Sequence, residues 1–398
     1  MALRILLLSP RIPYPLRDGG SLAMNQSLTA YLDQGVELSM LSMNTSRHWV
    51  DENTLPEWYT RLKHFRTVFV KTDINPLSAF LNLFSEKSYN VSRFVHREYE
   101  AELIRLLQQE EFDYIQFESI YTSPYLKTVR KYSEAKCICR VHNIEHHIWQ
   151  RLSEHEPSFL KRKYLELLTS RLRNYELDIL KHFDVLLPIS PQECKELEAL
   201  QLNRCYHLPF GVEESEVVVV PSERFATCFH IGSMDWAPNV EGVHWFLDQV
   251  WELIHHQFPE LHLTLAGKKM PPSIHADKEK NIEVPGEIDD LNSFYHQHNI
   301  MVVPLQSGAG VRIKILEAMA RGKVIVSTPL GAEGLGVQHQ EHLLLAEQPE
   351  TFCEQFSWLM THREEAIAMG LRGRTYVNET FCTRKLYTRW IADLETGW

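Results

Sequence analysis

Residues 304–327 have the composition best suited to binding a phosphorylated ligand. The apolar run 300–304 is followed by the glycine-rich stretch 306–310 and then by a helical pattern. Free backbone amides at the start of a helix attract negative charge, and the cations Arg312 and Lys314 stand at that place in the sequence. We therefore expect this segment to face a diphosphate.

A carboxylate deeper in the same helix can bind the sugar of a nucleotide. Glu317 lies about one turn beyond the cations, and its two oxygens can accept hydrogen bonds from both hydroxyls of a ribose. Residues two apart do not share a helix face, so we expect one of Arg312 and Lys314 to reach the phosphates. A structural salt bridge is the alternative explanation for this pair of cations.

Paired glycines form a second candidate site near the N-terminus. Gly19 and Gly20 follow the first apolar run and precede a helix that is expected to start at Ser21. Glycine lets the backbone approach a ligand closely, so the loop suits a diphosphate, and an ordinary tight turn explains it equally well. The spacing differs from G-x-G-x-x-G, which argues against a nicotinamide enzyme.

His142 is the third candidate, because it directly follows the apolar run 135–141. A polar residue at the carboxyl end of a parallel strand projects into the ligand cleft, where it can hydrogen-bond a substrate hydroxyl. His142, Glu145 and His146 could instead bind zinc, since histidines four apart on a helix share a face. The H-E-x-x-H pattern is absent and the chain has 20 histidines, so we expect no metal.

The elements that must position these residues alternate between short apolar runs and longer helical patterns, which is typical of βαβ units and a parallel sheet. In the first half the expected strands are 4–8, 37–42, 67–71, 114–117, 135–141 and 185–188. In the second half they are 226–231, 261–266, 282–285, 300–304, 324–327 and 342–346. Helices are expected at 240–257, 289–296, 311–321 and 384–394.

The two halves are separated by a helix-poor stretch that follows Pro209 and ends at Ser222. A chain of 398 residues is too long for one ordinary domain, and no sequence repeat links its halves. The expected fold is α/β, with two Rossmann-like domains facing each other across a cleft. Ligands bind at the carboxyl ends of the strands in such sheets.

The net charge of -11 lies entirely beyond residue 210, so nucleic acid is an unexpected partner. The segment 158–182, from Ser158 to His182, is a local exception that carries six cations on a helical pattern. It is explained either by a helix with a solvated outer face or by docking on an anionic membrane.

The sequence predicts a protein that remains in the cytoplasm. Its apolar runs are shorter than a membrane span requires, and its N-terminus passes directly into a strand pattern without a cleavage region. Seven cysteines without a CxxC pair suit a reducing compartment. Cys137 and Cys139 alternate in an apolar run and are interpreted as strand core.

Together these motifs resemble the family 4 (group 1) retaining glycosyltransferases of the GT-B fold, along nearly the whole chain. The resemblance is carried by Gly19-Gly20, His142, residues 209–212, 229–233, 263–267, 284–288 and the helix with Glu317-Ala318-Met319-Ala320-x-Gly322. It implies a cytoplasmic, metal-independent enzyme of polysaccharide biosynthesis that uses no cofactor. Such an enzyme moves a sugar from a UDP-, GDP- or ADP-linked donor to a glycan or lipid-linked acceptor.

The resemblance also implies domain limits and residue roles. Residues 1–209 would form the acceptor-side domain, joined by a C-terminal helix in 383–398 that crosses back, and residues 210–382 would bind the donor. His142 would contact the transferred sugar and Glu317 the ribose, as the catalytic pair. The implied donor-binding positions are Gly19, Gly20, Gly232, Ser233, Asn239, Ile288, Ala309, Gly310, Val311, Arg312, Lys314 and Glu317.

The chain departs from the family pattern around the phosphates. Ala309 stands where the family has the first of two glutamates, Ser233 stands where many members have arginine, and Asn239 replaces the usual lysine. We hypothesise that Arg312 or Lys314 restores the lost positive charge. Two alternatives remain open, a nucleotide-sugar-binding protein with lost or weak turnover and a nucleotide-sugar epimerase.

Overall fold

The computed structural model of the protein describes residues 2–16, 18–73, 82–202, 204–214, 225–308 and 312–397. The chain divides into two compact units, Met1–Pro209 with Tyr387–Trp398, and Phe210–Leu386. We call these unit 1 and unit 2. The first crossing lies between Pro209 and Phe210, and the second lies inside the last helix rather than before it.

Unit 1 contains a seven-stranded parallel sheet in the order β3-β2-β1-β4-β5-β6-β7. The strands are β1 (Arg4–Ser9), β2 (Glu37–Thr45), β3 (His64–Val70), β4 (Tyr114–Phe117), β5 (Lys136–Val141), β6 (Val185–Pro188) and β7 (Arg204–Cys205). The central strands are almost continuously apolar because helices cover both faces of the sheet. The strand order reverses between β1 and β4, which is the point where such sheets bind ligands.

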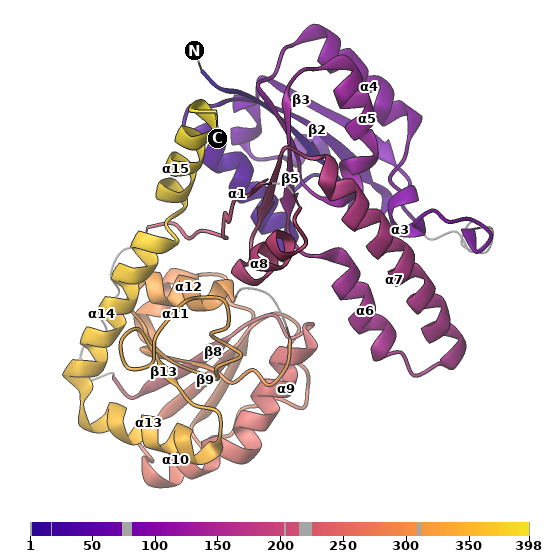
Figure 1. Cartoon of the computed structure of the whole chain (residues 1–398). Coiled ribbons are helices and arrows are strands. Elements are labelled where there is room, and N and C mark those ends of the chain that lie inside the picture. The colour runs from indigo at the N-terminus through magenta and orange to yellow at the C-terminus, as the bar shows by residue number, and fades with distance from the viewer. Residues whose placement is uncertain are drawn as a thin grey trace. The chain divides into compact units, whose positions relative to one another are not determined.

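The helices of unit 1 follow the strands in βαβ order (Figure 1). They are α1 (Gly19–Asp33), α3 (Tyr89–Ser92), α4 (Arg97–Gln109), α5 (Leu126–Tyr132), α6 (Glu145–Glu154), α7 (Phe159–Ile179) and α8 (Pro191–Ala199). Helices α6 and α7 form an antiparallel hairpin, which Figure 1 shows extending beyond the sheet.

Unit 2 repeats the architecture with a six-stranded parallel sheet in the order β10-β9-β8-β11-β12-β13. Its strands are β8 (Thr227–Ile231), β9 (His262–Ala266), β10 (Ile282–Gly286), β11 (Ile300–Val303), β12 (Val324–Ser327) and β13 (Leu344–Leu345). Its helices are α9 (Ala237–Trp245), α10 (Glu252–Gln257), α11 (Leu291–Gln297), α12 (Ile313–Ala320), α13 (Pro349–Thr361) and α14 (Arg363–Thr380). The order reverses again between β8 and β11.

Every strand expected from the sequence is present, and β7 is an addition at the sheet edge. The helix expected at 240–257 begins earlier and is interrupted by a π-helical turn, Phe246–Trp251, between α9 and α10. Helix α1 begins at Gly19 rather than Ser21, because Asp18 caps it and accepts a hydrogen bond from the Ser21 amide. Cys137 and Cys139 are fully buried strand residues, as expected.

The last helix, α15 (Thr383–Glu395), packs against unit 1. The Tyr387 hydroxyl donates to Ser27 Oγ at 2.8 Å, and the Trp390 indole donates to the Tyr31 hydroxyl at 2.7 Å. Both acceptors belong to α1, and Figure 1 shows the two helices side by side. Tyr114 on β4 donates to the Leu394 carbonyl at 2.9 Å, so the helix is also tied to the sheet.

Candidate active site

The loop after β8 is the first part of the site, and it is tightly packed. A Cβ added to Gly232 would lie 2.8 Å from Asn239 Nδ2 and 3.2 Å from Lys314 Nζ. Behind it, Gly267 has a φ of +147°, and a Cβ there would meet the Gly232 carbonyl oxygen at 1.7 Å. The two glycines thus let the ends of β8 and β9 approach as closely as backbone allows.

Lys314 reaches this loop from the start of α12. Its Nζ donates to Asn239 Oδ1 at 2.8 Å, while Asn239 Nδ2 donates to the Ser233 carbonyl oxygen at 2.8 Å. Lys314 therefore contacts Asn239, the position where the sequence resemblance implied a lost lysine. The structure brings Gly232, Ser233, Asn239 and Lys314 together, and we call these four residues the Lys314 cluster.

Burial, with a smaller contribution from the charge of Arg312, lowers the pKa of Lys314 to about 7. Its second neighbour is His230 Nε2, at 3.4 Å. Burial also holds the pKa of His230 well below its usual value, and its Nδ1 lies 2.9 Å from the Val302 carbonyl oxygen. Because a carbonyl can only accept, Nδ1 carries the proton and Nε2 presents a lone pair to Lys314.

Arg312 has a different position from the one expected. Helix α12 begins at Ile313, so Arg312 is its N-cap residue and the argument from helix faces does not apply. Its guanidinium lies 4.8 Å from the centre of the Trp236 ring, and the residue is 5% exposed. Trp236 precedes α9, so both Arg312 and Lys314 extend from α12 toward the segment that joins β8 to α9.

Glu317 and Ile288 are partly buried residues of unit 2. Burial raises the pKa of the Glu317 carboxyl, and the neighbouring Arg321 opposes that rise. Among the described residues none donates a hydrogen bond to this carboxylate. Ile288 packs against the hydrophobic cluster that contains Ile315 and Leu316 of α12, the helix that also carries Glu317. Ala309, Gly310 and Val311, the other expected donor contacts, lie outside the described residues.

A pocket of about 310 Å³ occupies the carboxyl ends of β1, β2, β4 and β5 in unit 1. His142 lies in its wall, as its place at the end of β5 predicted. The titratable residues of the wall are Arg11, Arg47, His48, Arg93, Glu118, His142 and Glu145. The remaining lining residues are Pro10, Gly20, Met24, Thr45, Thr72, Phe94, Ser119, Tyr121 and Asn143.

Gly20 lines this pocket, and a Cβ on it would meet Arg11 Nη2 at 2.9 Å. Arg11 is held by Asp18 through a two-pronged ion pair, so the first turn of α1 already faces a carboxylate. Gly19 has no atom within 4 Å of its Cβ position. Of the two glycines, Gly20 is thus the one whose lack of a side chain shapes the pocket.

His142 is held by a residue that the sequence reasoning missed. Its Nε2 lies 3.0 Å from Glu118 Oε2, and the Glu118 side chain is 1% exposed. Glu118 directly follows β4, so the rule that identified His142 at the end of β5 would have found it too. Arg47 and Arg93 had no such signal, because they lie in connecting segments.

The zinc alternative based on His142, Glu145 and His146 does not match their contacts. Glu145 accepts a hydrogen bond from the Tyr121 hydroxyl at 2.9 Å, and His146 pairs with the buried carboxylate of Glu176 at 2.7 Å. Burial raises the pKa of Glu145 to about 7, while the bond from Tyr121 opposes the rise. Each member of the triad thus has its own partner.

A different trio does come within metal-binding reach in the described residues. One ligand atom each from His146, His147 and Glu196 lies within 4.8 Å of the others. His147 and Glu196 also form a half-exposed ion pair at 3.2 Å, which explains their proximity without a metal.

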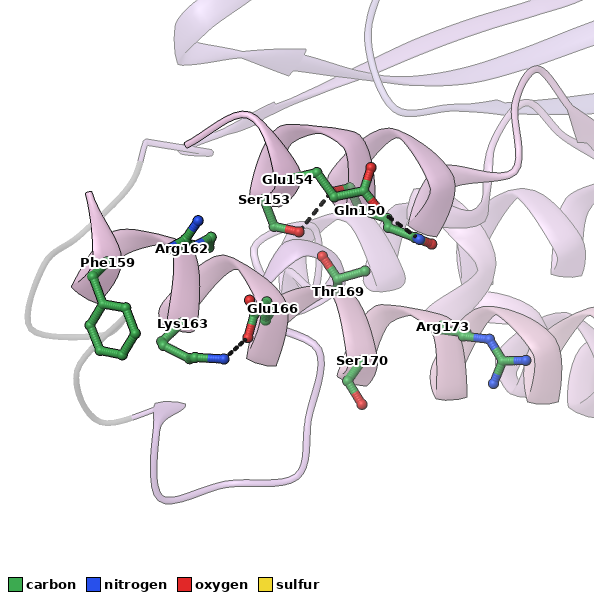
Figure 2. Close-up of a pocket in the computed structure, with 10 residues that line it drawn as sticks. All are labelled: Gln150, Ser153, Glu154, Phe159, Arg162, Lys163, Glu166, Thr169, Ser170 and Arg173. Atoms are coloured by element: carbon green, nitrogen blue, oxygen red, sulfur yellow. Dashed lines mark hydrogen bonds and ion pairs between the residues drawn. The ribbon is translucent and has the colours of Figure 1, made fainter. Parts of the chain in front are cut away.

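The segment 158–182 forms α7 and a short 3-10 turn, and its N-terminal half lines a second pocket with α6 (Figure 2). The wall contains the cations Arg162, Lys163 and Arg173, and Lys163 pairs with Glu166 at 2.7 Å. Phe159 and Leu160, at the start of α7, are 61% and 79% exposed. Over the described residues, every helix is too short or too polar to cross a membrane.

Part of unit 2 is similar to a known sequence family. Residues 225–362 match the family model described as "Glycosyl transferases group 1". Over 97% of its length the chain is also 24% identical to an "Uncharacterized 44.6 kDa protein in cps region" of Klebsiella pneumoniae, of which it covers 98%.

Solved structures share the fold of the whole chain. Sucrose-phosphate synthase from Thermosynechococcus elongatus is 16% identical, with a TM-score of 0.65 and coverage of 99% of this chain and 98% of that one. Anabaena HepE in complex with UDP is 11% identical, with a TM-score of 0.65 and coverage of 99% and 100%. With its two parallel sheets, the chain therefore has the GT-B fold of two Rossmann-like domains.

Proposed function

We propose that this protein is a retaining, metal-independent glycosyltransferase that moves a sugar from a nucleotide diphosphate sugar to an acceptor. The observation that carries the proposal is the contact between Lys314 and Asn239, beside Gly232, inside a group 1 glycosyltransferase domain. This contact supplies a cation where the sequence lacks the family's lysine. An ammonium beside helix-start amides stabilises a leaving diphosphate as its charge develops.

The donor is proposed to bind in unit 2. Lys314, with Arg312 near it, would neutralise the diphosphate, and the free carboxylate of Glu317 would accept both ribose hydroxyls. The Ile288 backbone would hold the base, and Ser233 and the glycine-rich stretch with Ala309, Gly310 and Val311 would complete the site. UDP is the first nucleotide to test, because Anabaena HepE was crystallised with it.

The pocket of unit 1 is proposed to serve the sugar and the acceptor, with His142 as the sugar contact and Gly20 in its wall. In addition to Arg11, which is paired with Asp18, the pocket wall contains the cations Arg47 and Arg93. These cations favour a lipid-linked acceptor that carries phosphate over a neutral glycan. The relative from the cps region supports a role in polysaccharide synthesis. Retention rests on the family resemblance, in which a donor phosphate oxygen takes the acceptor proton.

A binding protein without turnover is the second candidate, and Ser233 and Asn239 favour it because they replace family cations. An epimerase is the third, and it would convert the donor without any acceptor. The three candidates differ in their products, so one series of measurements separates them.

The test starts with thermal unfolding of the full chain in UDP-, GDP- and ADP-sugars. We expect one donor type to raise the melting temperature, since a ligand that binds the native state stabilises it. Diphosphate release is then measured with that donor, with and without a lipid-linked acceptor. Acceptor-dependent release supports the transferase. Saturable binding without release identifies the binder, and conversion of the free donor identifies the epimerase.

A further inference from the structure

Four buried side chains connect the C-terminal helix to His142 through consecutive hydrogen bonds. Trp390 on α15 donates to the Tyr31 hydroxyl at 2.7 Å, and that hydroxyl donates to Gln116 Oε1 at 2.7 Å. Gln116 Nε2 donates to Glu118 Oε1 at 2.6 Å, and Glu118 Oε2 lies 3.0 Å from His142 Nε2. We call this the Trp390–His142 chain.

Burial gives these contacts weight. Trp390 and Tyr31 have no exposed surface, and Gln116 and Glu118 are each 1% exposed. Leaving a buried polar group without its hydrogen-bond partner costs about 1–3 kcal/mol of stability. Each side chain of the Trp390–His142 chain therefore restricts the orientation of the next one. All five residues belong to unit 1, since Tyr387–Trp398 pack with it.

The two ends of the chain fix the direction of every hydrogen bond. An indole N–H can only donate, so the Tyr31 hydroxyl accepts from Trp390 and passes its own proton to Gln116. A carboxylate can only accept, so Glu118 must face the amide nitrogen of Gln116 and a protonated nitrogen of His142. Both ends give the same orientation of the Gln116 amide, with Oε1 toward Tyr31 and Nε2 toward Glu118.

We propose that Trp390, Tyr31 and Gln116 are positioning residues, which lock Glu118 and thereby hold the neutral His142 ring in its Nε2–H form. A hydrogen bond to one ring nitrogen decides which nitrogen carries the proton. His142 Nδ1 is then the basic atom of the ring. It is buried, and none of the described residues hydrogen-bonds it. If the proposed function holds, the C-terminal helix controls the sugar contact.

The experiment measures the tautomer of His142 directly, without any substrate. Two-bond 1H–15N correlations of the full chain, labelled with 15N-histidine, distinguish the Nε2–H form from the Nδ1–H form, and His142→Gln assigns the signal. We expect the wild-type ring to show the Nε2–H pattern. Tyr31→Phe removes a hydroxyl with little change in volume, and Trp390→Phe removes the indole donor together with part of the buried ring. Both should shift the His142 signals and broaden the tautomer distribution.

Matched controls separate positioning from packing. Tyr99→Phe removes another buried hydroxyl of unit 1, which donates to the Leu41 carbonyl at 3.0 Å. Trp251→Phe removes a buried indole donor of unit 2. Both controls should leave the His142 signals unchanged. In a turnover assay the two chain variants should lower kcat about five- to tenfold with little change in donor KM.

A wild-type ring in the Nδ1–H form overturns the proposal. The proposal is also overturned if the His142 signals in Tyr31→Phe are the same as in the wild type. Trp390→Phe provides a second, independent test of the same expectation. The wild-type spectrum gives its answer even if a variant does not fold. Because the NMR readout needs no turnover, a protein that shows the Nε2–H form and these shifts but transfers no sugar would contradict the proposed function alone.

Discussion

At the scale of single residues, the candidate site contains a lysine, Lys314, whose charge depends on whether an anion is bound beside it. Lys314 is held between two neutral partners, Asn239 and His230, and burial brings its pKa to about 7. Without a bound anion, its charge is therefore half lost near neutral pH. A bound diphosphate would stabilise the protonated ammonium form of Lys314, so that Lys314 takes up a proton on binding.

This arrangement predicts how donor affinity depends on pH. The complex keeps the proton that the free protein releases above about pH 7, so binding must take up a proton there and affinity falls as the pH rises. Lys314→Arg keeps its charge and should remove this dependence. Lys314→Met should weaken donor binding about ten- to hundredfold at pH 6.5.

Titration calorimetry of the donor between pH 6 and 9 measures both effects. Lys278→Met, which removes an exposed lysine of unit 2, is the control and should bind like wild type. Equal affinity of wild type and Lys314→Met at pH 6.5 would remove Lys314 from the donor site.

A second residue-scale prediction concerns the backbone behind the Lys314 cluster. Gly267→Ala would place a Cβ against the Gly232 carbonyl at a left-handed φ, and we expect it to reduce the free energy of unfolding by at least about 3 kcal/mol. Gly35→Ala shares a positive φ of +77° but meets no atom within 4 Å, so it should cost about 1–2 kcal/mol. Urea unfolding measures both, and similar losses in the two variants would contradict the close approach.

At the scale of elements, the hairpin of α6 and α7 is the part of the molecule whose composition fits a membrane surface. Its tip carries the exposed apolar side chains Leu152, Phe159 and Leu160, and three consecutive cations follow at 161–163. Apolar side chains beside basic ones are the combination that inserts into an anionic interface.

We expect the protein to sediment with vesicles that contain phosphatidylglycerol and less with pure phosphatidylcholine. Replacing Phe159 and Leu160 by serine together should reduce the bound fraction severalfold, because each removes apolar area from the interface. Leu253→Ser, at a 49% exposed leucine of α10, is the matched control. Equal sedimentation of all three proteins would show that α7 has simply a solvated outer face.

At the scale of the whole molecule, an anionic donor is proposed to bind the half of the chain that carries the net charge of -11. Charges farther away than about 8 Å are screened at physiological ionic strength, so the nearby cations of α12 matter more than the total. The two crossing segments also pair, since the Val212 amide donates to the Phe381 carbonyl at 2.7 Å and the Thr383 amide donates to the Val212 carbonyl at 3.1 Å.

Metal independence is a prediction for the whole protein. We expect transfer rates to be the same after dialysis against EDTA and after addition of Mg²⁺, because Lys314 and helix-start amides take the role of the ion. His147→Ala, which breaks the trio of His146, His147 and Glu196, should also retain activity. Loss of activity in EDTA, reproduced by His147→Ala, would show that this trio binds a required metal.

The amino-acid pattern was enough to predict the helices and strands and the strand ends that carry the candidate site. Apolar runs of the right length predict parallel strands, and this local pattern was enough to locate His142 and Gly232 just after strand ends and Glu317 in the helix that follows β11. It placed the starts of α1 and α12 less well. Asp18 caps α1 through a side-chain hydrogen bond that no periodicity reveals, and α12 begins only at Ile313, after the N-cap position Arg312.

Contacts between residues that are distant in the sequence became visible only in the folded chain. Lys314 and Asn239 are 75 positions apart, and Trp390 and Tyr31 are 359 apart, yet each pair shares a hydrogen bond. Such pairs depend on strand order and on the packing of α15, which a single sequence does not encode in any local pattern. The kind of chemistry could therefore be inferred from residue types, whereas the partner of each polar group required the folded chain.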